Sequence, residues 1–480
     1  MILLLLVYYI VLAPIIDNLL YAVSNEPPVA RSYIPLFGFA LTLTKNPYEF
    51  IYWLHHQYGN RVTVNIMSRR FLFLNEQTTF MNRIVKDPTF TLDFLDKISH
   101  NGGGLRWECI QNEEAKRIIV QEYHEYLYGQ ELVVLNHKTC EYLIERLTVD
   151  RLLSSSSETV NLFDYFGEII FDTAVTVLYG ETFARSQPDI YSSCRTFEAV
   201  IGTMMLDIPF KSFFLRSTIR QRNQFIERFL DLKPNDDMSK LILARIESMA
   251  NLDDGRVFNE WDRAGQHALL LWAAIINTGS LACWALVDLL LHHDALEAVN
   301  HELNTTVKNL TSLYNKETLD ELRILDSCIH ETMRRISPSV TQRQAGQNVI
   351  VTCTDGTQIG IRKNDIVVYP AILKHFDSEI YDHPYEYHYD RFIKQQSKVL
   401  PLILFGMGSR MCPGRYWAIN KIKLFLAIVL IKLDIQLLMD DDYKQKMRTR
   451  LNFQLSNLFT NLGPHEKDKH QFRIRYSMKK

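Results

Sequence analysis

Residues 405–415 read FGMGSRMCPGR and are followed by an amphipathic run that extends to about residue 433. The run predicts a helix, and Cys412 stands just before it. A thiolate in that place would be stabilised by unpaired amide N–H groups and by the positive end of the helix dipole. Gly406 and Gly408 allow the backbone to fold closely around the sulfur. The stretch therefore predicts a charged sulfur at the start of a helix.

Two further residues of this stretch fit a large flat ligand that carries acid groups. Gly414 would let the helix come close to a planar surface, because it has no side chain. Arg410 offers a forked donor of the kind that holds a carboxylate. A thiolate, a close planar group and an arginine for its acids together indicate a thiolate-ligated haem. The alternative is that Cys412 is a small buried hydrophobic residue, as lone cysteines usually are.

The complete pattern F-x-x-G-x-R-x-C-x-G, from Phe405 to Gly414, resembles the haem-ligand loop of the cytochrome P-450 family. The resemblance implies haem b as the cofactor, Cys412 as the ligand of its iron, and contacts to the haem from Phe405, Arg410 and Gly414. It also implies a mainly α fold with small β-sheets (α+β) and one haem-thiolate catalytic domain, here expected over residues 41–480.

Length and composition are those of an ordinary globular protein. The 480 residues are 47% hydrophobic and 22% charged, and the net charge of −2 gives no general electrostatic reason to bind nucleic acid. Seven cysteines, odd in number and scattered along the chain, do not predict a disulfide framework. They favour a reducing compartment.

The N-terminal segment predicts a membrane anchor. Residues 1–23 are almost entirely apolar, and as a helix they would be about 34 Å long, enough to cross a hydrocarbon core of about 30 Å. No basic residue precedes the apolar run and no convincing cleavage site follows it, which favours a retained anchor over a removed signal. Pro14 and Asp17 leave a tilted or partly interfacial helix open. The proline-rich residues 24–40 resemble the hinge that sets a membrane-bound P-450 domain against the bilayer.

The longest helix is predicted from about residue 259 to residue 291, where apolar residues occupy nearly every face, so that it should be buried all round. Thr278 can donate back to the Ala274 carbonyl and, with Gly279, loosen the helix locally. A loosened turn beside a haem would make room for oxygen or water. The alternative is a core helix with a satisfied threonine. Together with the cysteine loop, the helix resembles the family's oxygen-binding helix.

This helix departs from the family's usual pattern of small residue, glycine, any residue, acid and threonine. Ile275 stands where glycine is usual, and Asn277 stands where an acid is usual. Asn277 cannot titrate, although it can hold a water molecule. Candidates for lining the substrate pocket are Ile275, Ile276, Val340 and Phe459, which indicate only that the site is apolar.

Glu331 and Arg334 lie three residues apart in a predicted helix and therefore share one face. Alone, such a pair is usually a solvated surface feature. Here it resembles the family's glutamate–arginine pair, which a later arginine completes, and Arg391 stands in the matching segment. The resemblance implies that the trio is a structural lock near the haem. Arg343 lies where the family places another arginine on a haem propionate.

Strands are predicted at two places outside these motifs. Residues 61–75 alternate well enough for a strand pair with its turn at residues 68–70. Residues 350–369 read as strands with a hairpin turn at residues 355–356.

Several details resemble one branch of the family, that of cholesterol 7α-hydroxylase, sterol 12α-hydroxylase and prostacyclin synthase. They are Tyr389 where proline is usual, Trp272 and Trp284 on either side of Asn277, and the segment 34–38. The resemblance implies a monooxygenase that inserts one oxygen atom from O2 into an apolar lipid, a sterol or a related molecule. It places the enzyme in the endoplasmic reticulum membrane, with the catalytic domain facing the cytosol and electrons arriving from NADPH through the cytochrome P-450 reductase.

The implied chemistry divides the work among a few residues. The thiolate ligand pushes electron density to the iron and favours O–O cleavage. Thr278, with Asn277 and an ordered water, would deliver protons. The reductase would dock near Arg415, Lys421 and Lys423, although a solvated helix face explains these residues equally well.

Two other functions stay open. A peroxide isomerase of the prostacyclin synthase kind needs neither a reductase nor a proton relay. Asn277 fits both enzymes, whereas Thr278 favours the hydroxylase. A haem-containing lipid-binding protein without turnover is disfavoured by the ligand loop, by Thr278 and by the charged trio.

Overall fold

The computed structural model describes residues 12, 23–30, 32, 38–67, 69–153, 158–205, 211–336, 340–394, 402–408, 411–449, 455–457, 461–464 and 466–479. The expected anchor therefore lies outside the described residues except at Leu12 and Val23, and the expected hinge is described only in part. The chain divides into two compact units, each described here by itself. Unit 1 comprises Met1–Asp96, Ser337–Pro384 and Leu400–Cys412, and unit 2 comprises Lys97–Ile336, Tyr385–Val399 and Pro413–Lys480.

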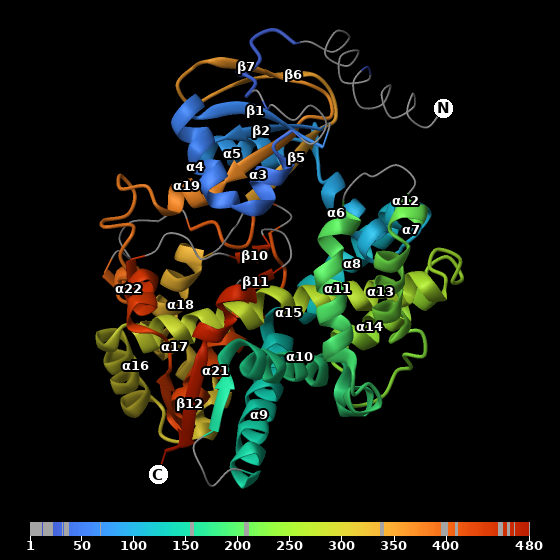
Figure 1. The fold of residues 1–480 in the computed structure, drawn as a ribbon. Coiled ribbons are helices and arrows are strands. Elements are labelled where there is room, and N and C mark those ends of the chain that lie inside the picture. The colour runs from blue at the N-terminus through green and yellow to red at the C-terminus, as the bar shows by residue number, and fades with distance from the viewer. Residues whose placement is uncertain are drawn as a thin grey trace. The chain divides into compact units, whose positions relative to one another are not determined.

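Unit 1 is built around a five-stranded sheet with short helices beside it (Figure 1). Its elements are α3 (Ala40–Lys45), α4 (Pro47–Tyr58), β1 (Arg61–Ile66), β2 (Arg69–Leu74), α5 (Thr78–Lys86), β3 (Phe90–Thr91), α6 (Asp93–Lys97, at the boundary), β5 (Val340–Ala345), β6 (Val349–Thr352), β7 (Gln358–Ile361), β8 (Ile366–Pro370) and α19 (Ala371–His375). The strand order is β1-β2-β8-β5-β3, with β2 and β8 parallel and the other pairs antiparallel. β6 and β7 form a separate antiparallel hairpin.

The predicted strand pair at residues 61–75 is confirmed, but its turn is shorter than expected. Ile66 pairs with Arg69, so that Arg69 and Arg70 belong to β2 and not to the turn. Arg70 has a partner just before β8, because its Nε donates to Asp365 Oδ1 at 2.8 Å. Arg70 was expected in the turn. Its ion pair with Asp365 stabilises it within β2 instead.

The predicted hairpin at residues 355–356 is also confirmed. Thr352 pairs with Gln358 at the ends of β6 and β7. Gly356 has a φ of 83°, in the left-handed region that glycine adopts without steric cost.

Unit 2 is mainly helical. Its elements are η2 (a π-helix, Ile98–Gly102), α7 (Trp107–Ile110), α8 (Glu113–Tyr126), α9 (Gly129–Leu153), β4 (Glu158–Asn161), α10 (Leu162–Ser186), α11 (Ile190–Met204), α12 (Lys211–Phe214), α13 (Arg216–Glu227), α14 (Lys240–Asn251), α15 (Glu260–Leu291), α16 (His293–Thr306), η3 (a 3-10 helix, Leu310–Tyr314), α17 (Lys316–Glu321), α18 (Arg323–Ile336), α20 (Arg391–Lys394), α21 (Arg415–Lys432), β9 (Leu433–Leu437), α22 (Asp441–Thr449), β10 (Leu455–Asn457), β11 (Asn461–Pro464), η5 (a 3-10 helix, Glu466–Gln471) and β12 (Arg473–Met478). β4, β12 and β9 form one small sheet and β10 and β11 another.

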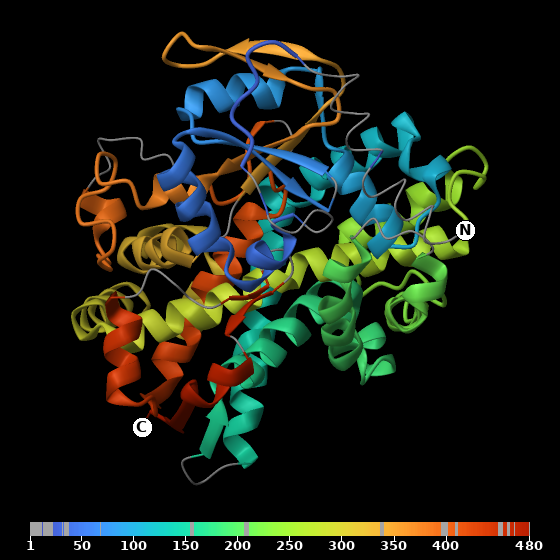
Figure 2. The same ribbon diagram turned by 45° about the horizontal axis from the view of Figure 1, so that its top comes forward.

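α15 is the central helix of unit 2, and it appears as the long yellow-green helix in Figure 2. It packs against α10, α13, α18 and α21, and most of its residues are buried. Asn259 and Asp262 cap its start reciprocally, each side chain accepting from the other's backbone N–H. The helix predicted at residues 259–291 is thus confirmed. Among the described helices α15 alone is long and apolar enough to cross a membrane, and its place in the core accounts for that composition.

The expected loosening of α15 near Gly279 is not seen, because the helix is continuous to Leu291. α21 likewise matches the predicted helix in length, with Gly414 at its N-cap. It is not amphipathic, however, since residues 421–430 are all buried. Helices packed on several sides of α21 bury even its polar positions.

Candidate active site

The cysteine loop of unit 1 is closed by two backbone hydrogen bonds. Cys412 N donates to the Phe405 carbonyl at 2.9 Å, and Met411 N donates to the Gly408 carbonyl at 3.2 Å. Gly406 and Gly408 have φ values of 77° and 74°, which residues with a side chain rarely adopt. The two glycines predicted to fold the chain around the sulfur therefore do so through left-handed backbone.

Space around the glycines fits the flat ligand that the sequence indicates. A Cβ added to Gly408 would lie 2.9 Å from Val85 Cγ2, so packing requires this glycine. A Cβ added to Gly406, or to Gly414 at the N-cap of α21, would meet no heavy atom within 4 Å. Each of these two glycines therefore borders open space.

Cys412 differs from the other six cysteines in its exposure. It is partly exposed, whereas the others are buried. Burial raises the pKa of the Cys353 thiol to about 11 and that of the Cys109 thiol to about 12, so these groups stay protonated at neutral pH. Cys412 is therefore the cysteine best placed to reach a ligand.

Arg343 on β5 supports the cysteine loop from within unit 1. Its side chain is buried, and its guanidinium donates to the Met407 carbonyl at 3.1 Å and to the Gln342 carbonyl at 2.7 Å. The family resemblance had implied a haem contact for Arg343, and the structure brings its side chain to the backbone of the cysteine loop. Arg410 lies outside the described residues.

In unit 2, Thr278 and Asn277 lie in the middle of α15. Thr278 is buried and its Oγ1 donates to the Ala274 carbonyl at 3.3 Å, which confirms the predicted back-bond. Asn277 and Ala273, one turn apart, are exposed although most of α15 is buried. This local exposure fits a face that receives a ligand.

The four pocket candidates fall in different surroundings. Ile275 belongs to the hydrophobic core of unit 2, and Ile276 is partly exposed. The backbone of Val340 pairs with Pro370 in the sheet of unit 1, but its side chain lies outside the described part of the chain. Phe459 lies outside it altogether.

The charged trio predicted from the sequence meets in the interior of unit 2. Arg334 donates to both oxygens of Glu331 at 2.8 Å, and Arg391 Nε donates to Glu331 Oε2 at 3.0 Å. The backbone N–H of His388 donates to Glu331 Oε1 at 3.2 Å. All three charged side chains are buried. A pair of this spacing is usually solvated, so its complete burial sets it apart from an ordinary surface pair.

Burial and hydrogen bonding act against each other on Glu331. Burial alone would raise the pKa of its carboxyl, but the bonds and charges of Arg334 and Arg391 lower that pKa below its ordinary value. Glu331 is therefore ionised at neutral pH, as an ion pair with two arginines requires.

A second buried ion pair on the same helix was not anticipated. Arg335 on α18 donates to Asp288 Oδ1 of α15 at 3.1 Å, and Thr332 donates to Asp288 Oδ2 at 2.8 Å. The sequence signal was present, because Asp288 is a lone acid in an otherwise apolar stretch of α15. A charge in such a stretch needs a partner when the helix is buried.

The basic residues proposed to dock a reductase are mostly not on the surface. Lys421 and Lys423 are 1% and 5% exposed, so the expectation of a solvated, partner-facing charge is wrong for both. Lys423 pairs with Asp326 at 2.7 Å. Arg415 donates to the Tyr128 hydroxyl at 2.7 Å. The two lysines are buried because helices surround α21, whereas Arg415 at the start of the helix is partly exposed.

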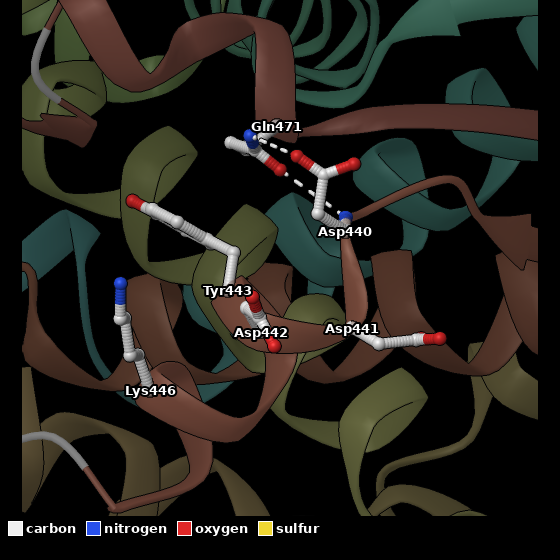
Figure 3. Close-up of a pocket in the computed structure, with 6 residues that line it drawn as sticks. All are labelled: Asp440, Asp441, Asp442, Tyr443, Lys446 and Gln471. Atoms are coloured by element: carbon white, nitrogen blue, oxygen red, sulfur yellow. Dashed lines mark hydrogen bonds between the residues drawn. The ribbon is translucent and has the colours of Figure 1, made fainter.

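A pocket of about 520 Å³ lies elsewhere in unit 2, and Figure 3 shows its lining. Acid groups dominate it, and the lining residues are Asp440, Asp441, Asp442, Tyr443, Lys446 and Gln471. Gln471 Nε2 donates to Asp440 Oδ2 at 2.7 Å, and Asp441 and Asp442 stand at the start of α22, where the helix dipole favours them. This polar pocket does not suit an apolar ligand, and its acids have structural roles.

Comparisons with known proteins agree with this arrangement. The profile of the cytochrome P450 family matches residues 27–459. Cytochrome P450 7B1 of Mus musculus is 26% identical over 447 residues, which cover 86% of this chain and 85% of the relative. Cytochrome P450 7A1 and a 7-alpha-hydroxycholest-4-en-3-one 12-alpha-hydroxylase, both of Oryctolagus cuniculus, are each 26% identical over 86% of this chain and 87% of their own length.

A solved structure shares the fold. The retinoic acid bound cyanobacterial CYP120A1 superposes with a TM-score of 0.73 at 19% identity, covering 95% of this chain and all of that one. The expected α+β P-450 fold and the resemblance to the sterol-hydroxylase branch are thereby confirmed. The chain belongs to the cytochrome P450 family, as a monooxygenase whose cofactor is haem b.

Proposed function

We propose that this enzyme inserts one oxygen atom of O2 into a sterol or a closely related apolar lipid, with electrons supplied by NADPH through the cytochrome P-450 reductase. The observation that carries the reaction type is Thr278, buried on α15 with its hydroxyl on the Ala274 carbonyl beside the exposed Asn277. The relatives named as sterol hydroxylases support the substrate class.

The proposed haem-binding residues have two roles: one ligates the iron, and the others contact the ring or its acid groups. Thiolate-ligated haem supplies, when bound, the oxygen activation needed to attack an unactivated C–H bond. Cys412 would be its ligand, with Phe405 and Gly414 in the same stretch beside the ring. Arg410 and Arg343 would serve the acid groups, and the bond from Arg343 to the Met407 carbonyl supports the loop at the same time.

Thr278 and Asn277 would handle protons. The Thr278 hydroxyl can donate, and it can accept a replacement proton from a water molecule held by the Asn277 amide. Asn277 does not titrate, so its part is to position that water. The exposure of Asn277 in the middle of a buried helix supports this assignment.

The trio Glu331, Arg334 and Arg391 would lock α18 to the first residue of α20, with no chemical role. Its complete burial and its bidentate geometry support a structural function. For the substrate pocket we propose Ile275, Ile276, Val340 and Phe459 as apolar contacts, which match a sterol in polarity without selecting one.

The remaining parts of the proposal concern the membrane. Residues 1–23 would form a retained anchor, residues 24–40 the hinge, and residues 41–480 the catalytic domain, on the cytosolic side of the endoplasmic reticulum. The apolar sequence of residues 1–23 supports the anchor.

A peroxide isomerase is the second candidate, and Asn277 is compatible with it as it is with the monooxygenase. An isomerase consumes no external protons, so a non-titrating residue at this position costs it nothing. Thr278 is the counter-argument, because the isomerase has no use for its hydroxyl.

A spectral titration tests the substrate class. Purified holoenzyme should shift its Soret absorption on addition of a sterol such as cholesterol or 25-hydroxycholesterol, because an apolar ligand displaces water near the iron. Palmitate serves as the comparison lipid. A shift with palmitate and none with any sterol would rule out the sterol assignment.

A further inference from the structure

Lys421 on α21 is buried in a way that lysines rarely are. Its side chain is 1% exposed, and the residues that follow it on α21 are buried as well. Nζ donates to the Ala274 carbonyl of α15 at 3.0 Å and lies 4.5 Å from the centre of the Trp417 ring. No carboxylate among the described residues compensates its charge, and burial lowers its pKa to about 7.

Its neighbour Lys423 shows what a structural lysine on this helix looks like. Lys423 is also buried, but its Nζ pairs with Asp326 at 2.7 Å and donates to the Leu319 carbonyl at 3.1 Å. An ammonium without such a counter-charge is costly to bury. Because Lys421 has no such ion pair among the described residues, we do not expect its burial to stabilise the fold.

The Ala274 carbonyl is the acceptor that Thr278 also uses. Thr278 Oγ1 lies 3.3 Å from it, a longer bond than the one from Lys421. In a continuous α-helix the same oxygen also accepts the backbone N–H of Thr278. A carbonyl oxygen has two lone pairs, so three donors compete for it. Of the two side-chain donors Lys421 Nζ makes the shorter bond, and the hydroxyl is the one that can turn away.

We propose that Lys421 is a positioning residue for Thr278: by occupying the Ala274 carbonyl, it weakens the back-bond of the Thr278 hydroxyl and leaves that hydroxyl available to exchange protons outside the helix. The inference rests on the proton-handling role proposed for Thr278. In this arrangement a side chain of α21, Lys421, donates a hydrogen bond to the backbone of α15. The neighbouring Asn277 provides no titrating group. Trp417 holds the lysine in place, since its ring lies beside Nζ and its own Nε1 donates to Thr139 at 3.1 Å.

A double-mutant cycle, with the Tm of the holoenzyme as its measurement, tests without any substrate whether the two side chains compete for the carbonyl. Thr278→Val removes the hydroxyl and keeps the shape, and Lys421→Met removes the donor and keeps most of the stem. With Lys421 in place the back-bond is weak, so Thr278→Val should lower Tm only slightly. In the Lys421→Met background the bond strengthens, and Thr278→Val should lower Tm clearly more. Lys423→Met is the matched control, in whose background the effect of Thr278→Val should equal that in wild type. Equal effects in all three backgrounds would overturn the competition.

Turnover supplies the second measurement, with 25-hydroxycholesterol, reductase and NADPH. Lys421→Met should raise the hydrogen peroxide released per NADPH about fivefold, the change expected from one hydrogen bond, while KM for the sterol stays constant. Lys421→Gln retains an N–H donor and should return the ratio toward wild type, which a merely structural loss would not allow. Wild-type ratios in both variants would overturn the positioning role.

The two measurements separate this inference from the proposed function. If Thr278→Ala leaves peroxide release unchanged while the double-mutant cycle is non-additive, the proton-handling role of Thr278 fails and the sharing of the carbonyl stands. If Thr278→Ala uncouples the enzyme and the cycle is additive, the proposed function stands and Lys421 has no part in it.

Discussion

At the scale of single residues, the chemistry of this protein depends on which polar side chains are buried with partners and which are not. Cys412 is partly exposed in a loop that two left-handed glycines shape, whereas the other six cysteines are buried thiols. Glu331 is a fully buried acid, yet two arginines keep it charged. The same residue types thus take opposite roles according to their surroundings.

The assignment of Cys412 as the iron ligand predicts a spectral loss. Cys412→Ala should abolish the red-shifted absorption band of the ferrous carbon monoxide complex, because no other group in the loop can donate a thiolate. Cys353→Ala should leave the band unchanged, since burial keeps that thiol protonated. An unaltered band in Cys412→Ala would exclude this cysteine as the ligand.

Removal of the Glu331 charge should destabilise the fold severely. Glu331→Gln removes the carboxylate that pairs with both buried arginines, Arg334 and Arg391, and breaking a buried ion pair costs about 3–5 kcal/mol. The expected result is a lower Tm and loss of haem during purification. Glu321→Gln, at an exposed position on α17, is the control and should behave like wild type. Wild-type stability of Glu331→Gln would mean that the trio is not a lock.

The pH dependence of stability follows from the same group. The pKa of Glu331 is lower in the folded protein than its ordinary value of 4.5. Its ion pairs therefore contribute fully above about pH 4.5, and the contribution is lost as the pH falls further and the carboxylate is protonated. Denaturation at decreasing pH should show this loss in wild type and not in Glu331→Gln.

At the scale of elements, α15 and α21 separate what sequence periodicity predicts from what it does not. The bounds of both helices followed from apolar runs in the sequence, and the cap of α15 at Asn259 is seen only in the structure. Their burial is a property of packing, and the predicted amphipathic character of α21 is wrong because Lys421 and Lys423 are buried. Asp326 on α18 satisfies Lys423, and this long-range contact has no local signature in the sequence.

Coupling between electron use and product formation should depend on α15. Thr278→Ala should leave NADPH consumption intact while product falls and peroxide rises, because it removes a proton donor and touches neither the iron ligand nor the electron supply. Asn277→Asp should be tolerated or improve coupling, since it restores the acid most relatives use. The ratio of product to peroxide measures both effects. A ratio unchanged by Thr278→Ala would remove the hydroxyl from the reaction.

At the scale of the whole molecule, the fold was predictable from one loop and the site only in part. The pattern around Cys412 is specific enough to imply the family, and with it the α+β fold. Some local features could be predicted because they depend on residues close in sequence. They are the role of the loop glycines, the Thr278 back-bond and the shared helix face of Glu331 and Arg334. The burial of Lys421 depends on contacts between helices far apart in the chain, so periodicity does not reveal it.

The anchor proposed for the N-terminus should be separable from catalysis. Deletion of residues 1–23 should give a protein that loads haem and binds membranes less, because the apolar run ends before the proline-rich residues 24–40. Flotation with liposomes and the carbon monoxide spectrum measure the two properties. Failure of the truncated protein to load haem, where the full chain does, would contradict a separable anchor.

Oxygen incorporation tests the central claim most directly. Holoenzyme is incubated with 25-hydroxycholesterol under labelled O2, with and without reductase and NADPH, and the product is analysed by mass spectrometry. A sterol monooxygenase should give a product that carries one labelled oxygen atom, only when both reductase and NADPH are present, and in lower yield with Thr278→Ala. Rearrangement of a lipid peroxide without reductase or NADPH, at a rate that Thr278→Ala does not change, would contradict the account and establish the isomerase.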